Sequence, residues 1–86
     1  MLYLVTSNNT RNVSSLVAAE TERVNELRAA GVIRNGWVKA DLSGAFLLLD
    51  CANEAEASAV LNTLPAVIND ATTFVLTEVV DLDSLG

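Results

Sequence analysis

Apolar residues recur with a helical period between Val13 and Ala30. At about 100° per residue, five of them fall on one narrow stripe: Val13, Leu16, Val17, Val24 and Leu27. Gly31 follows directly, and glycine is the residue that most often closes a helix in the left-handed conformation. The pattern therefore predicts one amphipathic helix over residues 13–30, with the stripe facing a core.

Four other stretches have the composition of strands, and one more has that of a helix. We predict strands at residues 2–7, 32–40, 45–51 and 72–80, which are rich in β-branched, aromatic and other apolar residues. Residues 41–44, Asp-Leu-Ser-Gly, form a short hairpin connection. Asn53 stands three positions before Glu56 and resembles a capping box, so a second helix should begin there and end at or before Pro65.

The order strand, helix, strand, strand, helix, strand (βαββαβ) defines an α+β protein. Such a chain folds as a four-stranded antiparallel sheet with two helices on one face, the ferredoxin-like arrangement. The other sheet face carries apolar residues and has no helix to cover it. We predict that it closes against the same face of a second copy, giving a dimeric α+β barrel, a homodimer or higher homo-oligomer. The 86 residues form a single domain, 1–86, with a flexible acidic tail at 81–86.

The amino-acid composition limits the binding partners and the metal or cofactor chemistry that we expect for this protein. The formal net charge of −6 leaves no basic stripe, which disfavours binding to nucleic acid and to anionic membrane surfaces. No apolar run is long enough to span a bilayer and no signal peptide is recognisable, so we expect a cytoplasmic protein. The chain has no histidine, and its one cysteine, Cys51, should be an inert buried thiol. We therefore expect no metal and no other cofactor.

Glu20 lies in the middle of the apolar stripe, where helical amphipathicity does not account for a charged residue. A carboxylate that faces a core must be paired, hydrogen-bonded or neutral. The same surroundings produce general acids and bases, so Glu20 is the candidate catalytic residue. The alternative is that the helix starts late or rotates, so that Glu20 reaches solvent or pairs with Arg34 or Lys39.

Three further residues are candidates for substrate binding. Arg34 could hold a substrate carboxylate through its planar fork, or it could be an ordinary exposed strand residue. Trp37 could be a platform for the substrate, although burial in the core or in a dimer interface is the simpler interpretation. Tyr3 could donate a phenolic hydrogen bond into a pocket, or merely pack its ring.

The joint spacing of several short motifs resembles the muconolactone isomerase family. The motifs are Glu20-Thr21-Glu22, Leu27-Arg28-Ala29-Ala30-Gly31, Arg34-Asn35-Gly36-Trp37, Asp50 and Leu64-Pro65. The resemblance implies a ferredoxin-like subunit of a cofactor-free oligomer that shifts a proton within an unsaturated lactone of aromatic catabolism. It also implies that Glu20 matches a family carboxylate on the helix, and that Arg34 and Trp37 match an arginine and a tryptophan on the second strand.

The residues and the resemblance together predict a cofactor-free isomerase that acts on a small unsaturated lactone or a related carbonyl compound. Glu20 would relay the proton, Arg34 would anchor an acid group, and Tyr3 or backbone amides would steady the enolate-like oxygen, in a pocket between the first helix and the sheet. Two alternatives stay open. One is a non-catalytic dimeric module for small-molecule binding or assembly, and the other is a cofactor-free oxygenase or cyclase of the same barrel type.

Overall fold

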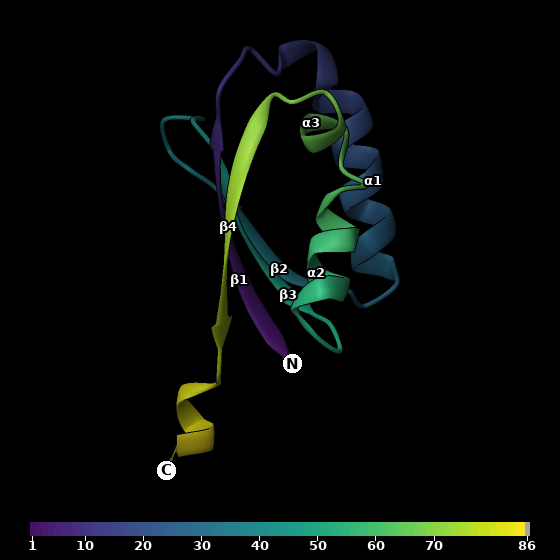
Figure 1. Cartoon of the computed structure of the whole chain (residues 1–86). Coiled ribbons are helices and arrows are strands. Elements are labelled where there is room, and N and C mark those ends of the chain that lie inside the picture. Colours follow the sequence, from purple (N-terminus) through teal and green to yellow (C-terminus); the bar gives the residue numbers. More distant parts are fainter. Residues whose placement is uncertain (86) are drawn as a thin grey trace.

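The strands of the protein form one antiparallel sheet in the order β2-β3-β1-β4, and the α-helices pack on one side of it (Figure 1). The structure, a computed structural model, describes residues 1–85. Its elements are β1 (Leu2–Asn9), the 3-10 helix η1 (Ser14–Leu16), α1 (Val17–Ala29), β2 (Ile33–Val38), β3 (Ala45–Asp50), α2 (Glu54–Leu61), α3 (Pro65–Ile68), β4 (Thr72–Val79) and the 3-10 helix η2 (Leu82–Leu85). The predicted α+β, ferredoxin-like order is confirmed, with α3 as an added short helix.

Helix α1 begins at Val17 and not at Val13, because the preceding turn is the 3-10 helix η1. The side chain of Asn12 accepts the N–H of Ser14 at 2.9 Å and orders this turn. At the other end Gly31 has a φ of +78°, the left-handed closing conformation that the sequence predicts. One consequence of the later start is that Val17 is 55% exposed and does not face the core.

The capping box before α2 is confirmed in a modified form. The Asn53 side chain accepts the N–H of Glu56 at 2.8 Å, and the Glu56 carboxylate accepts the N–H of Ala52 at 3.4 Å. Helix α2 ends at Leu61, and Pro65 does not close it but opens α3. Proline fits the first helical position, because its missing N–H would have no partner there.

Strand β2 has an irregular register between Ile33 and Asn35. Ile33 pairs with Leu49 and is buried, whereas Trp37 pairs with Phe46. Phe46 and Leu49 are three positions apart on β3, so they face opposite sides of the sheet. Regular alternation would place Ile33 and Trp37 on one side, but an extra residue at the irregularity reverses the side chains that follow.

The core lies between the sheet and the helices. Its buried side chains are Tyr3, Val5, Leu27, Ile33, Leu49, Cys51, Ala57, Leu61 and Leu64. The burial predicted for the Cys51 thiol is confirmed, and this burial raises its pKa, which keeps it in the unreactive protonated form. No helix within residues 1–85 is long and apolar enough to cross a bilayer.

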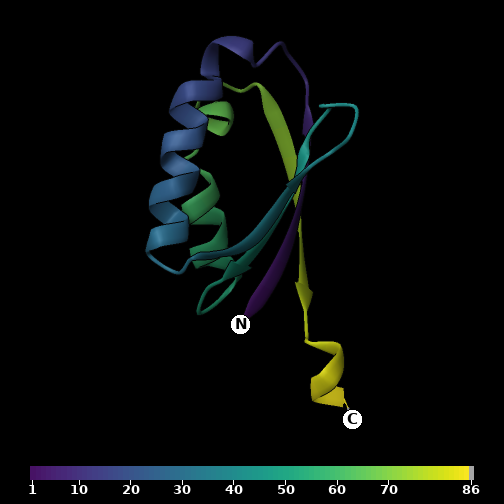
Figure 2. The same ribbon diagram turned by 180° about the vertical axis from the view of Figure 1, so that it is seen from behind.

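The second face of the sheet carries no helix within the described part of the chain, as Figures 1 and 2 show from opposite sides. Its apolar side chains include Leu4, Phe46 and Leu48, which are half-buried. Trp37 and Val75 on the same face are 51% and 63% exposed. The predicted uncovered apolar face is therefore present in the single chain.

The acidic segment predicted as a tail continues beyond β4. Residues Leu82–Leu85 form η2, in which the N–H of Ser84 donates to the carbonyl of Asp81 at 2.9 Å. This segment projects past the end of the sheet (Figure 1). Gly86, the last residue of the predicted tail, lies outside the described residues.

Candidate functional site

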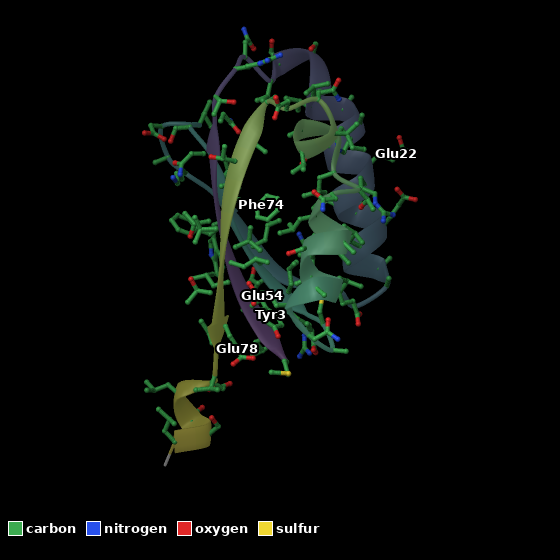
Figure 3. The ribbon with its side chains drawn as sticks, viewed as in Figure 1. Tyr3, Glu22, Glu54, Phe74 and Glu78 are labelled. Atoms are coloured by element: carbon green, nitrogen blue, oxygen red, sulfur yellow. The ribbon has the colours of Figure 1, made fainter. Side chains whose placement is uncertain are left out.

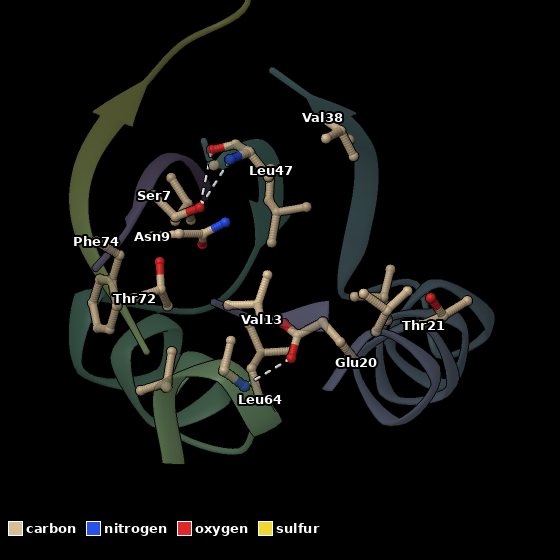
Figure 4. A pocket seen from close by; sticks show the side chains of 18 of the residues that line it. Ser7, Asn9, Val13, Glu20, Thr21, Val38, Leu47, Leu64, Thr72 and Phe74 are labelled. Carbon is tan, nitrogen blue, oxygen red and sulfur yellow. Dashed lines mark hydrogen bonds between the residues drawn. The ribbon is translucent and has the colours of Figure 1, made fainter. Parts of the chain in front are cut away.

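A cavity of about 880 Å³ lies between α1 and the sheet (Figure 4). Its walls are largely apolar and include Val5, Val24, Ile33, Leu47, Leu64 and Phe74. Small-molecule sites typically measure about 300–1,000 Å³ and are lined mostly by apolar side chains with a few polar groups. The cavity therefore has the size and the lining of a ligand site, in the place where the sequence predicts a pocket.

Glu20 is one of the polar groups that line this cavity. Its side chain is half-buried, and Oε2 accepts the backbone N–H of Ala66 at 2.9 Å, in the first turn of α3. Figure 4 shows this hydrogen bond beside Leu64. A carboxylate offers about four acceptor positions, so the bond to Ala66 leaves others for a ligand.

The ion pairs that the sequence left open for Glu20 do not form. Arg34 donates to Asp50 Oδ2 at 2.8 Å, and Lys39 donates to Asn8 Oδ1 at 2.6 Å. Within residues 1–85 the Glu20 carboxylate has no ion-pair partner. It is therefore a carboxylate held by one backbone N–H against a largely apolar wall, which suits a group that accepts and returns a proton.

The other predicted site residues are distributed differently. Trp37 borders the cavity and is half exposed. Arg34 does not line the cavity, and its guanidinium binds Asp50 at the end of β3. Asp50 also accepts from the N-terminal ammonium at 3.3 Å. The ammonium, and then Arg34, holds the pKa of Asp50 below its usual value.

Tyr3 also lies away from the cavity lining, at the opposite end of β1. Its ring is buried and its hydroxyl donates to Glu78 Oε1 at 3.4 Å (Figure 3). Burial, and then the charge of Glu78, raises the pKa of Tyr3. Of the four predicted site residues, the structure thus brings the Glu20 side chain to the cavity, leaves Trp37 at the border with its ring on the uncovered sheet face, and engages Arg34 and Tyr3 elsewhere.

A polar end of the cavity has no counterpart among the predicted site residues. Ser7, Asn9 and Thr72 lie together there (Figure 4), and Arg11 and Asn12 complete the lining. Apart from Thr72, these residues lie in or next to a polar stretch, residues 8–12, that follows the predicted strand at 2–7. The signal was present, since alternation along β1 places Ser7 and Asn9 on the buried face of that strand. Within residues 1–85, no group of three or more acidic, cysteine or histidine side chains is placed to hold a metal ion.

The fold and the cavity define a class of protein, a small ferredoxin-like domain with a half-buried carboxylate in a ligand-sized cavity. The chain belongs to the muconolactone delta-isomerase family, whose model matches residues 1–81. No curated protein matches the chain significantly in sequence.

Two solved structures share this fold. The first is 5-chloro-2-hydroxyhydroquinone dehydrochlorinase from Burkholderia phenoliruptrix AC1100, determined in complex with 2,5-dihydroxybenzoquinone. It superposes with a TM-score of 0.84 at 15% identity, over 98% of each chain. The second is a muconolactone isomerase, with a TM-score of 0.80 at 20% identity over 98% of this chain and 93% of the other. At these identities the likeness shows the fold.

Proposed function

We propose that the protein is a cofactor-free isomerase that shifts a proton within a small unsaturated lactone or a related carbonyl compound. The observation that carries the proposal is the position of Glu20, a half-buried carboxylate in the wall of a ligand-sized cavity. Membership of the muconolactone delta-isomerase family supports the reaction class. The similar structures of a muconolactone isomerase and of an enzyme that binds a dihydroxybenzoquinone support a cyclic oxygenated ligand.

In the proposed reaction Glu20 removes a proton from the saturated ring carbon at the far end of the C=C bond, which is conjugated to the carbonyl group. The electron pair of the broken C–H bond moves into the conjugated system and forms an enolate-like anion. The Glu20 carboxyl, whose proton exchanges with solvent, then returns a proton to the carbon next to the carbonyl group, so the product is an isomer and no redox partner is needed. A single positioned carboxylate contributes about 10²–10⁴-fold to such a step.

The proposed roles of Arg34 and Tyr3 stay predictions. Arg34 would bind a substrate acid group in exchange for Asp50, and Tyr3 would turn its hydroxyl from Glu78 to the enolate oxygen. The role of Trp37 also stays a prediction, because its ring lies on the uncovered sheet face and not in the cavity. Glu20 needs no such rearrangement, and the proposal therefore depends on this residue first.

The test is to follow deuterium incorporation from heavy water into muconolactone by NMR. Glu20→Gln keeps the shape of the side chain and an oxygen that can accept the Ala66 N–H, but it removes the proton acceptor. We expect the rate to fall about 10²–10⁴-fold. Glu22→Gln is the matched control, because Glu22 lies exposed on the same helix (Figure 3). Exchange at the full rate in the Glu20→Gln protein would remove Glu20 from the mechanism.

A non-catalytic binding module is the second candidate, and one observation favours it. The bond from the Ala66 N–H to Glu20 gives this carboxylate a structural use, since an acceptor at the first turn of a helix is stabilising by itself. In that case the protein would bind the lactone, as measured by calorimetry, but would exchange no proton. Binding without exchange in the unmodified protein therefore selects the module over the isomerase.

We also propose that the uncovered sheet face binds the same face of a second copy, giving the dimeric barrel. The exposure of Val75 and Trp37 supports this, because soluble monomers rarely leave large apolar patches in water. Val75→Asp should convert the dimer to monomer in light scattering after size exclusion. Ile68→Asp, at a residue of similar exposure on α3, is the control and should leave the mass unchanged. A monomeric unmodified protein would contradict this assembly.

A further inference from the structure

The cavity has two chemically different ends, whose order follows from the register of the sheet. Ile33 pairs with Leu49, next to Tyr3, near the start of β1. Asn9 pairs with Thr72 at the other end of that strand. The apolar walls around Ile33 therefore lie at one end of the cavity, and the polar lining lies at the other.

The polar end presents hydrogen-bond donors. The hydroxyls of Ser7 and Thr72 already donate to backbone carbonyls, at 3.3 and 3.0 Å. The guanidinium of Arg11 and the amide nitrogen of Asn12 donate no hydrogen bond within residues 1–85, although both residues line the cavity. Both residues are exposed, so water satisfies these donors in the free protein. An arginine at the cavity that pairs with no protein carboxylate can exchange this water for a ligand carboxylate, which only accepts and which binds arginine strongly.

The backbone of the residue before Arg11 is anchored to the loop before β4. The N–H of the preceding residue, Thr10, donates to the carbonyl of Ala71 at 2.8 Å. Asp70 in the adjoining loop forms no ion pair with Arg11. The other arginine of the lining, Arg28, lies in the last turn of α1, where a positive charge is favourable without any ligand.

We propose that Arg11 binds the acid group of the cavity's ligand, and that this ligand is an elongated carboxylate with an apolar body of at least two rings. The body would extend toward Ile33, past Glu20 on α1. The volume of about 880 Å³ supports the length, because sites of about 300 Å³ already hold small ligands. The inference rests on the proposed function for the site but not for the reaction, and it changes two details: Arg11 rather than Arg34 binds the acid group, and the ligand is longer than a single lactone ring.

The experiment measures the dissociation constants of two probes by calorimetry, the two-ring carboxylate 2-naphthoate and its neutral analogue 2-naphthalenemethanol. Arg11→Gln should weaken naphthoate binding about tenfold, which corresponds to one charge-assisted contact at a partly exposed site. The affinity for the neutral probe should not change. Added salt should weaken naphthoate binding to the unmodified protein, since Arg11 is exposed.

Two other arginines serve as matched comparisons. Arg28→Gln, at the opposite end of the cavity, and Arg23→Gln, outside the cavity lining, should each change naphthoate affinity by less than about twofold. Circular dichroism checks that the Arg11→Gln protein is folded. An equal loss for the neutral probe, an equal loss in the Arg28→Gln or Arg23→Gln protein, or no naphthoate binding at all would overturn the proposal. Loss of proton exchange in the Glu20→Gln protein is a separate result, so either proposal can fail alone.

Discussion

Substitution of Glu20 separates the contribution of this residue to stability from its contribution to proton transfer. Glu20→Ala deletes the only side-chain acceptor that the structure gives the Ala66 N–H, and Ala66 itself is 8% exposed. Hydrogen bonds to charged groups contribute about 1.5–3 kcal/mol, and loss of an N-terminal cap costs about 0.5–2 kcal/mol. Because Glu20 is only half-buried, we expect the free energy of unfolding to fall by about 1–2 kcal/mol. In a domain of this size each kcal/mol lowers Tm by about 4–8 °C.

Urea unfolding followed by circular dichroism measures this change. Glu20→Gln retains an oxygen acceptor and should lose less than about 0.5 kcal/mol, as should the exposed control Glu22→Ala. We therefore expect the Glu20→Ala protein to be less stable than the Glu20→Gln protein, whereas both substitutions should abolish proton exchange. If Glu20→Ala is as stable as Glu22→Ala, the bond to Ala66 does not contribute. If Glu20→Gln is as unstable as Glu20→Ala, the negative charge matters and not the acceptor.

Three further predictions concern the core and the titrating groups. Leu49→Ala, at a fully buried position, should lower the free energy of unfolding by about 2–5 kcal/mol in urea, and a loss near zero would contradict the core assignment. Tyr3, the single tyrosine, has a raised pKa, so its contribution to stability is present below its usual pKa of 10.0 and is lost as pH rises through the higher pKa of the folded protein. Ultraviolet titration should show the raised pKa of Tyr3, and Glu78→Gln should lower this pKa. Asp50 has a lowered pKa, so its contribution to stability is present above its usual pKa of 3.8 and is lost as pH falls through the lower pKa of the folded protein. Asp50→Asn should remove this loss of stability in acid, and Arg34→Gln should remove part of the loss.

The order of the elements and the place of Glu20 could be predicted from periodicity alone. Helical periodicity identifies a charged residue on an apolar stripe, because the direction of each side chain around a helix follows from its position in the sequence. The cavity lining on α1 bears this out at Glu20 and Val24. What the stripe could not show is the partner of the carboxylate, because the N–H of Ala66 comes from a turn far along the chain.

The strand residues were harder to place, and the reason is the register of β2. Alternation fixes a side chain only while the pairing is regular, and the irregularity between Ile33 and Asn35 reverses the sides of the strand. The pairing of Arg34 with Asp50 likewise depends on which strands are neighbours, which the sequence alone does not determine. Arg11, in the loop after β1, lies in a polar stretch with no period to reveal that it lines the cavity.

The most direct measurement of the central claim is a crystal structure of the protein with a saturated analogue of muconolactone, which cannot isomerise. The account predicts that the analogue occupies the cavity between α1 and the sheet, with the carbon that would lose its proton about 3–3.5 Å from a Glu20 carboxylate oxygen. An analogue bound on the uncovered sheet face, or in the cavity but out of reach of Glu20, would contradict it.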